Sequence, residues 1–470
     1  THAKEKAQLL GEGGRKLTRS ESTPDTCKFK ELLMPSITYH GSGKVSLNIG
    51  YFKTLIASHS AELKKKEQKK LCGGCLVLLL SHLLQGPAST AIFHLGVETP
   101  LKLFNAKSRS IMQSATISSS LSDMPYSQFG LMGKGQVVAV ADTGCDLAHC
   151  DFEDPNGKVT AKPAPDKSFD ANIRKVIQYT YVQGQADTDD AQGGHGTHVC
   201  GTVAGYKAGA SLDSQDGQNA GVAPEAQLAF MDMVTGDGQG LAIPDTTDGL
   251  YSPGHAAGAR VHTNSWGAQF EGGDKGYYSE GDTDKWLYEH PEHLVLFAAG
   301  NSGGQSEYQQ GMQAQAKNVV SVGATETAQG NIDSMASFSS IGPAADGRIK
   351  PDISAPGHPI QSADATGRGQ QSCGYAGKSG TSMASPGAAG VAALIRQYFM
   401  EKWSDICSEL ATKNQYIYIP PTSTLESICA NKEPSGVLLK AILLHSGEGM
   451  SRFESRTLKA PPDIYQGYGR

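Results

Sequence analysis

Short, almost continuously apolar segments recur through the C-terminal two thirds of this chain. They occupy residues 136–141 (QVVAVA), 227–233, 293–299 (HLVLFAA) and 318–322. Runs of this length without polar alternation are typical of strands that a parallel sheet buries on both faces. Segments with helical character lie between or after them, at residues 194–204, 388–400 and 436–445. Strands that alternate with helices predict an α/β fold, a three-layer sandwich around a mostly parallel central sheet.

The first 121 residues lack this regularity. Their charges are scattered, and the serine-rich stretch at 118–122 is typical of a linker. We therefore predict a poorly defined N-terminal region over residues 1–121 and one large domain over residues 122–470. Because the chain begins with Thr1 rather than Met, we also expect further sequence upstream.

One apolar run in the N-terminal region has a different character. Residues 75–84 (CLVLLLSHLL) follow the cationic stretch 64–70, which is the order of charge and apolarity in a signal peptide. A run of about ten residues is half the length that a membrane-spanning helix needs, so we predict no transmembrane segment in this chain. An internal signal, a propeptide helix and an imperfectly assembled gene sequence remain open as explanations.

Charge and composition narrow the classes of partner. The 470 residues carry 41 Lys and Arg against 47 Asp and Glu, a formal net charge of −6, and no basic block runs through the body of the chain. Nucleic acid is therefore excluded as the main partner, because phosphate binding needs a cationic face. The 56 glycines follow no G-x-y period, which excludes collagen and indicates an enzyme with many tight turns.

Cysteines and loop carboxylates raise the question of metal sites. The nine cysteines leave the redox compartment open, because an odd number cannot pair completely. Cys72-Gly-Gly-Cys75 has the spacing of a redox or zinc site, but no second pair of ligands accompanies it, so a small-residue turn is favoured. Asp187, Asp189 and Asp190 favour a solvated acidic loop, with a structural calcium site as the alternative. No set of metal ligands is assigned.

An acid, a base and a nucleophile lie where predicted strands and helices meet. Asp142 follows the first buried strand, His195 opens a helical segment, and Ser382 lies in a loop that runs into another. In α/β sheets, reactive groups collect at the carboxyl ends of the strands. Serine becomes a nucleophile near neutral pH when an imidazole takes its proton and a carboxylate orients the imidazole. These three residues are therefore predicted to form a catalytic triad.

Asn301 adds a fourth group. It follows the apolar run 293–299 and offers a side-chain N–H which, with the backbone N–H of Ser382, would hold a tetrahedral oxyanion. Each motif has an ordinary explanation when taken alone: Asp-Thr-Gly as a strand-to-turn element, Gly-Asn as a turn and Gly-Thr-Ser as a helix cap. Their occurrence together, in the order Asp, His, Asn, Ser, indicates the chemistry.

The segments around these four residues resemble those of the subtilisin-type serine peptidases, the subtilases. The resemblance rests on VVAVADTGCD, GGHGTHVCGTVAG, NSWG, FAAGNSGG and GTSMASPGAAG, and it extends over about residues 133–470. It implies a subtilisin-like fold and a serine endopeptidase that acts through an acyl-enzyme, with Asp142, His195 and Ser382 as the triad and Asn301 as the oxyanion donor. It implies no cofactor for catalysis, and it makes the N-terminal region a prosegment or linker.

The same resemblance implies where a peptide would bind. Two segments would flank an extended peptide that adds as a strand, namely Ser265-Trp266-Gly267 and Gly238-Gln239-Gly240. A wall of the S1 pocket would be formed by Ala298, Ala299 and Gly300. The small size of these wall residues favours large or apolar P1 side chains.

Finer similarities, such as GARVHTNSWG and the closing YQGYGR, resemble the subtilase branch with a β-sandwich domain after the catalytic one and the protease–transporter fusions of some protists. We therefore expect the protein to continue beyond Arg470. The favoured function is a serine endopeptidase, made as a precursor and secreted or vesicular, that acts on a protein or peptide substrate. An inactive, subtilase-shaped scaffold is disfavoured because all four catalytic positions are intact. A processing module within a larger membrane fusion is compatible with an active triad, and transmembrane segments downstream would identify it.

Overall fold

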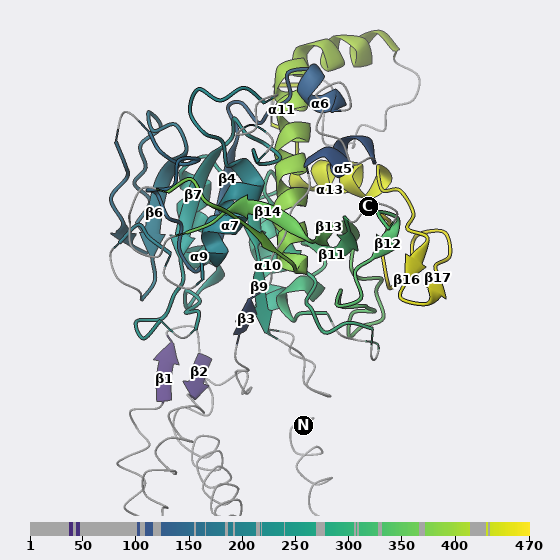
Figure 1. Cartoon of the computed structure of the whole chain (residues 1–470), viewed down its shortest axis with the longest axis horizontal. Coiled ribbons are helices and arrows are strands. Elements are labelled where there is room, and N and C mark those ends of the chain that lie inside the picture. Colours follow the sequence, from purple (N-terminus) through teal and green to yellow (C-terminus); the bar gives the residue numbers. More distant parts are fainter. Residues whose placement is uncertain are drawn as a thin grey trace, which may run out of the picture. The chain divides into compact units, whose positions relative to one another are not determined.

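The computed structural model describes residues 37–40, 44–47, 101–103, 109–115, 124–154, 157–164, 166–183, 187–190, 193–212, 217, 219–238, 240–268, 278–304, 307, 310–327, 331–365, 372–413, 429–430 and 433–470. The chain divides into two compact units, residues 1–98 and 99–470. In the first unit, the described residues form one antiparallel pair, β1 (Ile37–His40) with β2 (Lys44–Leu47). All other described elements belong to the second unit (Figure 1).

An 11-stranded sheet forms the framework of the second unit. Its order is β17-β16-β12-β11-β10-β8-β4-β7-β6-β5, and β13 pairs with β11 off this path. The strands from β5 to β11 in this order run parallel to one another, and β13 is parallel to β11. β12 pairs antiparallel with β11 and parallel with β16, and β16 pairs antiparallel with β17. The predicted α/β fold with a mostly parallel sheet is confirmed. The strands are β4 (Val137–Asp142), β5 (Lys162–Pro163), β6 (Val176–Tyr181), β7 (Gln227–Asp232), β8 (Val261–Asn264), β10 (Leu294–Ala298), β11 (Val320–Glu326), β12 (Ser334–Met335), β13 (Ile353–His358), β16 (Arg452–Phe453) and β17 (Arg456–Thr457).

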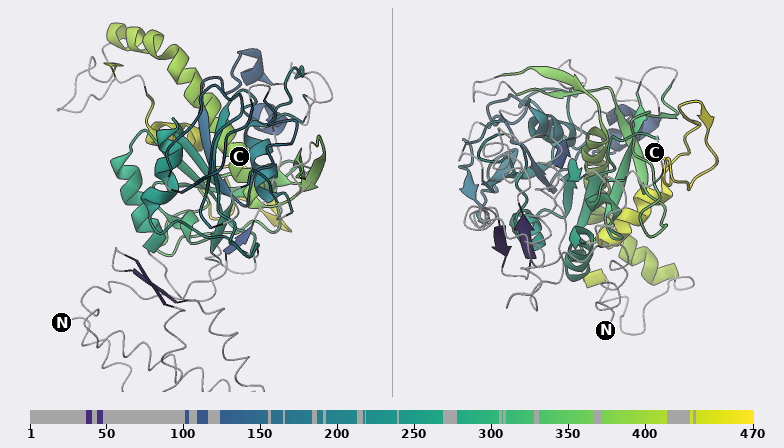
Figure 2. Two further views of the ribbon diagram at one scale, coloured as in Figure 1. Left: turned by 90° about the vertical axis from the view of Figure 1, so that its left-hand side faces the viewer. Right: turned by 90° about the horizontal axis from the view of Figure 1, so that it is seen from below.

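Helices cover both faces of this sheet (Figures 1 and 2). The larger ones are α7 (His195–Ala204), α9 (Thr247–Ala256), α10 (Tyr278–Glu289), α11 (Thr381–Lys413) and α13 (Gly436–His445). The remaining elements are β3 (Leu101–Leu103), α5 (Arg109–Ser114), α6 (Pro125–Gln128), β9 (Trp266–Ala268), η4 (Gln313–Gln315), β14 (Ile360–Ala363) and β15 (Tyr375–Lys378). Among the described residues, no helix has both the length and the apolarity that a bilayer crossing requires.

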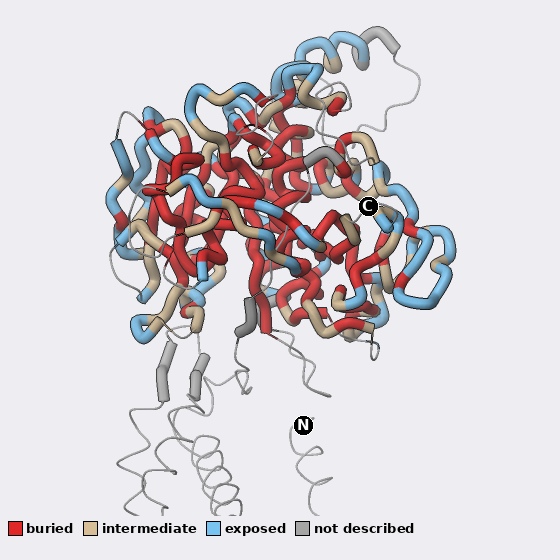
Figure 3. The backbone as a smooth tube through the Cα atoms, viewed as in Figure 1, coloured by how far each residue is buried: buried red, intermediate tan, exposed pale blue. Residues whose placement is uncertain are grey.

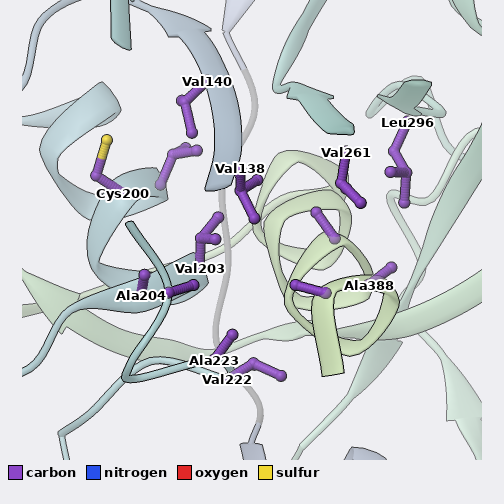
Figure 4. Close-up of a cluster of buried hydrophobic side chains, with 14 of the residues drawn as sticks. Val138, Val140, Cys200, Val203, Ala204, Val222, Ala223, Val261, Leu296 and Ala388 are labelled. Carbon is purple, nitrogen blue, oxygen red and sulfur yellow. The ribbon is translucent and has the colours of Figure 1, made fainter. Parts of the chain in front are cut away.

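Alternate residues of β4 show why its sequence is apolar at every position. Val138 and Val140 pack in the same hydrophobic cluster as residues of α7, α11 and α13 (Figure 4). Ala141 belongs instead to a cluster with residues of α9 and α10. Both faces of the strand are therefore buried beneath helices. Figure 3 shows buried residues, in red, concentrated in the interior of the second unit. Three layers result, as the sequence predicts.

The predicted helices correspond to observed ones, with one difference. Residues 194–204 match α7 and residues 436–445 match α13, whereas residues 388–400 are only the middle of α11, which has 33 residues. Its N-terminal turns contain Pro386, which made this part unlike a helix by sequence. Because α11 begins at Thr381, Ser382 lies in its first turn rather than in a preceding loop.

The carboxyl ends of the central strands meet at one edge of the sheet. Asp142 of β4 pairs in register with Asp232 of β7, and Ala141 pairs with Asn264 of β8. Asn264 in turn lies opposite Phe297 of β10. This register brings the segments that follow β4, β8 and β10 to the same edge, although they are far apart in sequence.

Candidate active site

Asp142 and His195 form a buried pair at this edge. Asp142 ends β4 with no exposed surface, and His195 is the first residue of α7. The imidazole Nδ1 lies 2.6 Å from Asp142 Oδ1, and the backbone N–H of Thr143 donates to the same oxygen at 2.8 Å. His195 Nε2 is buried and has no hydrogen-bond partner in the described part of the chain. The carboxylate thus orients the ring and leaves its second nitrogen unoccupied.

Two glycines allow the end of β4 to approach the start of α7. A Cβ on Gly196 would lie 2.1 Å from the carbonyl oxygen of Gly144 and 3.0 Å from Asp142 Cβ. A Cβ on Gly144, whose φ is +145°, would lie 2.4 Å from the carbonyl oxygen of Asp189. Neither position has room for a side chain. The short Asp142–His195 contact therefore depends on backbone-to-backbone packing at Gly144 and Gly196.

Asp190 is a functional residue that the sequence interpretation missed. It is 1% exposed, so its expected place in a solvated acidic loop is wrong, whereas Asp187 is exposed as expected. One carboxylate oxygen accepts from Thr143 Oγ1 at 3.1 Å, and the other accepts from the backbone N–H and the hydroxyl of Thr197, both at 2.9 Å. Burial raises its pKa to about 6. Asp190 therefore ties the residue after Asp142 to the first turn of α7.

The cap of α7 explains why a carboxylate is buried there. The N-cap residue, Gly194, has φ +65° and supplies no side-chain hydrogen bond. Asp190 satisfies an N-terminal N–H of the helix in its place, and a negative charge at this end interacts favourably with the helix dipole. A carboxylate just ahead of a predicted helix start was the sequence signal that could have identified this role.

Ser382 is held by Ser265 rather than by His195. Its Oγ donates to the carbonyl oxygen of Ser265 at 2.8 Å, and Ser265 Oγ donates to the carbonyl oxygen of Ser382 at 2.7 Å. The second bond has a local cause. The carbonyl of Ser382 would normally accept from the residue four positions on, but that residue is Pro386, which has no N–H. Ser265 supplies the missing donor, and so fixes the start of α11.

Asn301 lies next to Ser382 through Thr381. Its Oδ1 accepts from the backbone N–H and the hydroxyl of Thr381, both at 2.9 Å. A backbone N–H requires an oxygen acceptor, so these bonds fix the orientation of the amide and direct Nδ2 away from Thr381. The Thr381 hydroxyl also accepts from the N–H of Gly300 at 3.1 Å. The turn that carries Asn301 is thus tied directly to the residue before Ser382.

The residues predicted to bind substrate lie around the same edge. Ser265 is buried, and Trp266 begins β9 with its indole N–H donating to the carbonyl oxygen of Ala141 at 3.0 Å. The Trp266 side chain therefore packs in the core, and only its backbone is available to a peptide. Gly267 follows it in β9, and a Cβ there would lie 3.4 Å from Gln313 Oε1. β9 pairs antiparallel with β3, with Trp266 opposite Leu103 and Ala268 opposite Leu101.

The second predicted substrate segment follows β7, and the predicted S1 wall lies at the end of β10. Gly238 lies in a turn after β7 with φ +68°, and its N–H donates to the carbonyl oxygen of Thr235 at 2.8 Å. Gln239 falls outside the described residues. Ala298 and Ala299 are buried at the end of β10, and Gly300 has φ +115°.

The described cysteines form two disulfides and one pair of thiols. Cys150 bonds to Cys373, and Cys407 bonds to Cys429. Cys145 and Cys200 are free and fully buried, and their thiols form a hydrogen bond with each other. Burial raises the pKa of both thiols, which keeps them protonated and unreactive near neutral pH. Cys72 and Cys75 lie outside the described residues.

One cluster within the described residues has the composition of a metal site. His149 Nδ1, Cys150 Sγ and an Asp151 carboxylate oxygen lie within 4.8 Å of one another. However, the sulfur of Cys150 is in a disulfide, His149 Nε2 lies 2.7 Å from the carbonyl oxygen of Gly374, and His149 Nδ1 accepts from the N–H of Asp151 at 3.1 Å. The donor atoms of His149 and Cys150 are therefore already engaged, which leaves only the Asp151 carboxylate, and we assign no metal to this cluster.

Comparisons with known proteins point to one family. A family model described as the subtilase family matches residues 133–436. The chain is 32% identical over 404 residues to the serine protease/ABC transporter B family protein tagD of Dictyostelium discoideum, which covers 68% of this chain and 20% of that protein. It is 33% identical over 308 residues to Subtilisin BL of Lederbergia lenta, which covers 65% of this chain and 91% of that protein. The chain spans about a fifth of the length of tagD and of its relative tagB.

Proposed function

This chain belongs to the subtilase family of serine peptidases, and we propose that it hydrolyses peptide bonds through a triad of Asp142, His195 and Ser382. The observation that carries the proposal is the 2.6 Å contact between Asp142 Oδ1 and His195 Nδ1. A carboxylate that accepts from Nδ1 leaves the lone pair of the ring on Nε2, the nitrogen that must take a proton. Nε2 is the ring atom without a partner among the described residues.

The first step requires a small movement of Ser382. Its Oγ donates to the carbonyl oxygen of Ser265, and a change of χ1 rotamer would direct the same proton to His195 Nε2. Oγ then attacks the carbonyl carbon of the peptide while Nε2 takes the hydroxyl proton. The imidazolium passes this proton to the leaving amine, which gives an acyl-enzyme, and a water molecule activated by the same imidazole hydrolyses it. None of these steps needs a cofactor.

Asn301 is proposed to stabilise the charge that develops during this attack. The carbonyl oxygen of the substrate becomes an oxyanion, which needs hydrogen-bond donors that are already in place. Asn301 Nδ2 and the backbone N–H of Ser382 supply two, because Thr381 fixes the amide orientation through Asn301 Oδ1. The N-terminal end of α11 adds a partial positive charge at the same point.

We infer that the substrate is an extended protein or peptide segment that adds to the edge of β9. The pairing of β3 with β9 supports this, because it shows that the backbone of Trp266–Ala268 accepts an antiparallel strand. Ser265 and Gly267 would flank the peptide from this side and Gly238 from the other, with Ala298, Ala299 and Gly300 as the S1 wall. β3 belongs to the N-terminal 121 residues, so we propose that this region is a prosegment that occupies the edge before substrate does.

The Dictyostelium relatives favour a wider context for the same activity. The names of tagD and tagB join a serine protease to an ABC transporter, and the chain aligns with about a fifth of each. We propose that this chain is the peptidase part of a larger protein of the secretory or vesicular pathway. A structural calcium ion remains compatible with the proposal but has no assigned ligands.

A fluorophosphonate probe tests the identity of the nucleophile in the full chain. We expect the wild type to be labelled and Ser382→Ala to remain unlabelled, with loss of peptide hydrolysis. Ser385→Ala is a matched control, because Ser385 lies one turn further along α11 and its hydroxyl contacts Thr263 Oγ1 at 2.9 Å. Labelling that persists in Ser382→Ala, or that is missing from the folded wild type, would contradict the proposal.

A further inference from the structure

One lysine connects the segment that carries the serine to the segment that carries the histidine. Lys378 ends β15, four residues before Ser382. Its ammonium donates to the carbonyl oxygen of Gly193 and, at 3.0 Å, to that of Gly194. These two glycines immediately precede His195. The side chain of Lys378 therefore reaches from the end of β15, just before Ser382, to the turn that precedes His195.

The turn before His195 needs an external partner of this kind. Gly193 and Gly194 are consecutive left-handed residues, with φ +69° and +65°, and Gly194 is the uncapped start of α7. The carbonyl oxygen of Gly194 also accepts the first helical N–H, that of His198, at 3.2 Å. Glycines resist distortion least among residues, because they have no side chain to restrict φ and ψ. An ammonium with three donors can hold both carbonyl groups at once.

The rest of the β14–β15 hairpin contacts α7 beyond this turn. His198 Nε2 lies 3.1 Å from the carbonyl oxygen of Ala376, and Ser362 Oγ donates to the carbonyl oxygen of His198 at 2.8 Å. These contacts fix the first turn of the helix, whereas Lys378 acts on the residues just before His195. The β14–β15 hairpin, through these contacts and Lys378, thus sets the position of His195 relative to β15 and the start of α11.

The charges around Lys378 keep its ammonium in place. Burial lowers its pKa, and the carboxylates of Asp190, Asp364 and Asp142 act in the opposite direction. Asp190 binds the N–H of Thr197 in the first turn of α7. His195 therefore lies between a carboxylate that binds a helix N–H after it and an ammonium that binds the two carbonyl groups before it.

We propose that Lys378 is a positioning residue that holds the histidine turn at the correct distance and angle from Ser382. This rests on the proposed peptidase function. The imidazole must reach Ser382 Oγ when the hydroxyl leaves Ser265, and it must do so at hydrogen-bond distance. A displacement of about 1 Å in such a pair costs on the order of 10²-fold in rate. Lys378 does not touch the reacting atoms and acts through His195.

Steady-state hydrolysis of a peptide substrate by the full chain tests this role. In Lys378→Met, which keeps an unbranched side chain but has no donors, we expect kcat to fall by about 10- to 100-fold with KM within about twofold of wild type. Lys378→Arg retains donors for both carbonyl groups and is expected to recover most of kcat. Lys285→Met is the matched control, because it removes the same charge from the exposed surface of α10.

The outcomes separate this inference from the proposed function. Wild-type hydrolysis that survives Ser382→Ala would remove the proposed function itself. Hydrolysis that depends on Ser382 but is unchanged in Lys378→Met would overturn the positioning role alone. A loss of activity in Lys378→Met that comes with a matching fall in Tm, and that Lys378→Arg does not recover, would also overturn it, because Lys378 would then act only on stability.

Discussion

Two kinds of buried histidine occur in this protein, and their surroundings differ. His195, at the carboxyl edge of the sheet, is 7% exposed and lies 2.6 Å from the carboxylate of Asp142. His262 of β8 is 2% exposed on the face covered by α9 and α10, and neither of its ring nitrogens has a hydrogen-bond partner among the described residues. His262 instead contacts Tyr251 edge-on, with ring centroids 5.0 Å apart.

The difference shows what a carboxylate adds to a buried imidazole. Without one, burial favours the neutral ring, and the pKa of His262 falls to about 3. His293, which lies beside it with ring centroids 6.4 Å apart, also has a pKa lowered by burial. The ring of His262 serves as apolar packing, whereas His293 Nδ1 lies 3.3 Å from His255 Nδ1. With Asp142 as a partner, His195 Nδ1 contacts a carboxylate, and Nε2, the base of the proposed triad, is left without a partner among the described residues.

The largest effect is expected from removing the carboxylate that contacts His195. In Asp142→Asn, the amide keeps the shape of the side chain but can donate to Nδ1, which would place the ring proton on Nε2. We expect kcat to fall by about 10⁴-fold, the size of effect known for this change in a serine peptidase triad. Initial rates at saturating substrate measure the loss of kcat, and Tm measures the effect on stability.

The stability of Asp142→Asn provides the control. We expect Tm to fall by only a few degrees, because the NH₂ group that faces Nδ1 replaces the oxygen that also accepts from the Thr143 N–H, so one hydrogen bond is lost. If kcat fell only in proportion to the folded fraction of the variant, Asp142 would act as a packing residue, like the residues that surround His262.

The sequence predicts the position of His195 at the edge of the sheet, but it does not predict the burial of His262. The apolar run 136–141 and the helix start at His195 place Asp142 and His195 at strand and helix ends, where α/β proteins gather reactive groups. Nothing in the local sequence distinguishes His262 from a surface residue of a strand, because its burial depends on α9 and α10 packing over β8. The pattern of apolar residues describes one element at a time and does not show which elements pack over it.

The same limit applies at the candidate site. The pairing of Asp190 with Thr197 and that of Lys378 with Gly193 and Gly194 join segments whose approach the fold alone decides. The hydrogen bond of Ser382 to Ser265 crosses 117 residues of sequence. Sequence identifies which chemical groups are present, whereas their partners emerge only when the sheet order is known.

An intermediate effect is expected at Asp190, which supports His195 from a distance. In Asp190→Asn, one carboxylate oxygen becomes an NH₂ group, so either Thr143 or Thr197 loses its acceptor. We expect a loss of about 1.5–3 kcal/mol in the free energy of unfolding, typical of a bond to a charged group. Urea unfolding of the wild type and the variant at pH 8 measures it.

The pH dependence tests whether burial opposes the ionisation of Asp190. Its pKa is raised to about 6, so in the folded wild type the carboxyl gains its proton as pH falls through that value, whereas in the unfolded chain it stays ionised down to about pH 4. The stability that this group contributes is therefore fully present below about pH 4 and is lost as pH rises through about 6. Because the asparagine of the variant does not titrate, we expect the stability difference between wild type and variant to be larger at pH 5 than at pH 8, by about 1 kcal/mol. An equal difference at both values would mean that the folded protein does not raise the pKa of Asp190.

The smallest effect is expected at His262, and it has the opposite sign. Its folded-state pKa of about 3 lies below the usual value of about 6.5, so the unfolded chain takes up a proton first as pH falls. Stability is therefore fully present above about pH 6.5 and declines as pH falls toward 3. Between pH 8 and pH 6 this single group accounts for about 1 kcal/mol.

Replacing the ring tests that share directly. In His262→Phe, the edge contact with Tyr251 is kept and the titrating group is gone, so the fall in unfolding free energy from pH 8 to pH 6 should shrink by about 1 kcal/mol. Any cost of the slightly larger ring appears equally at both pH values and cancels in the difference. His255 and His293 lie in the same cluster and burial lowers the pKa of each, so part of the decline remains. A decline as steep as that of the wild type would mean that His262 has a polar partner after all, and the contrast with His195 would then be one of degree.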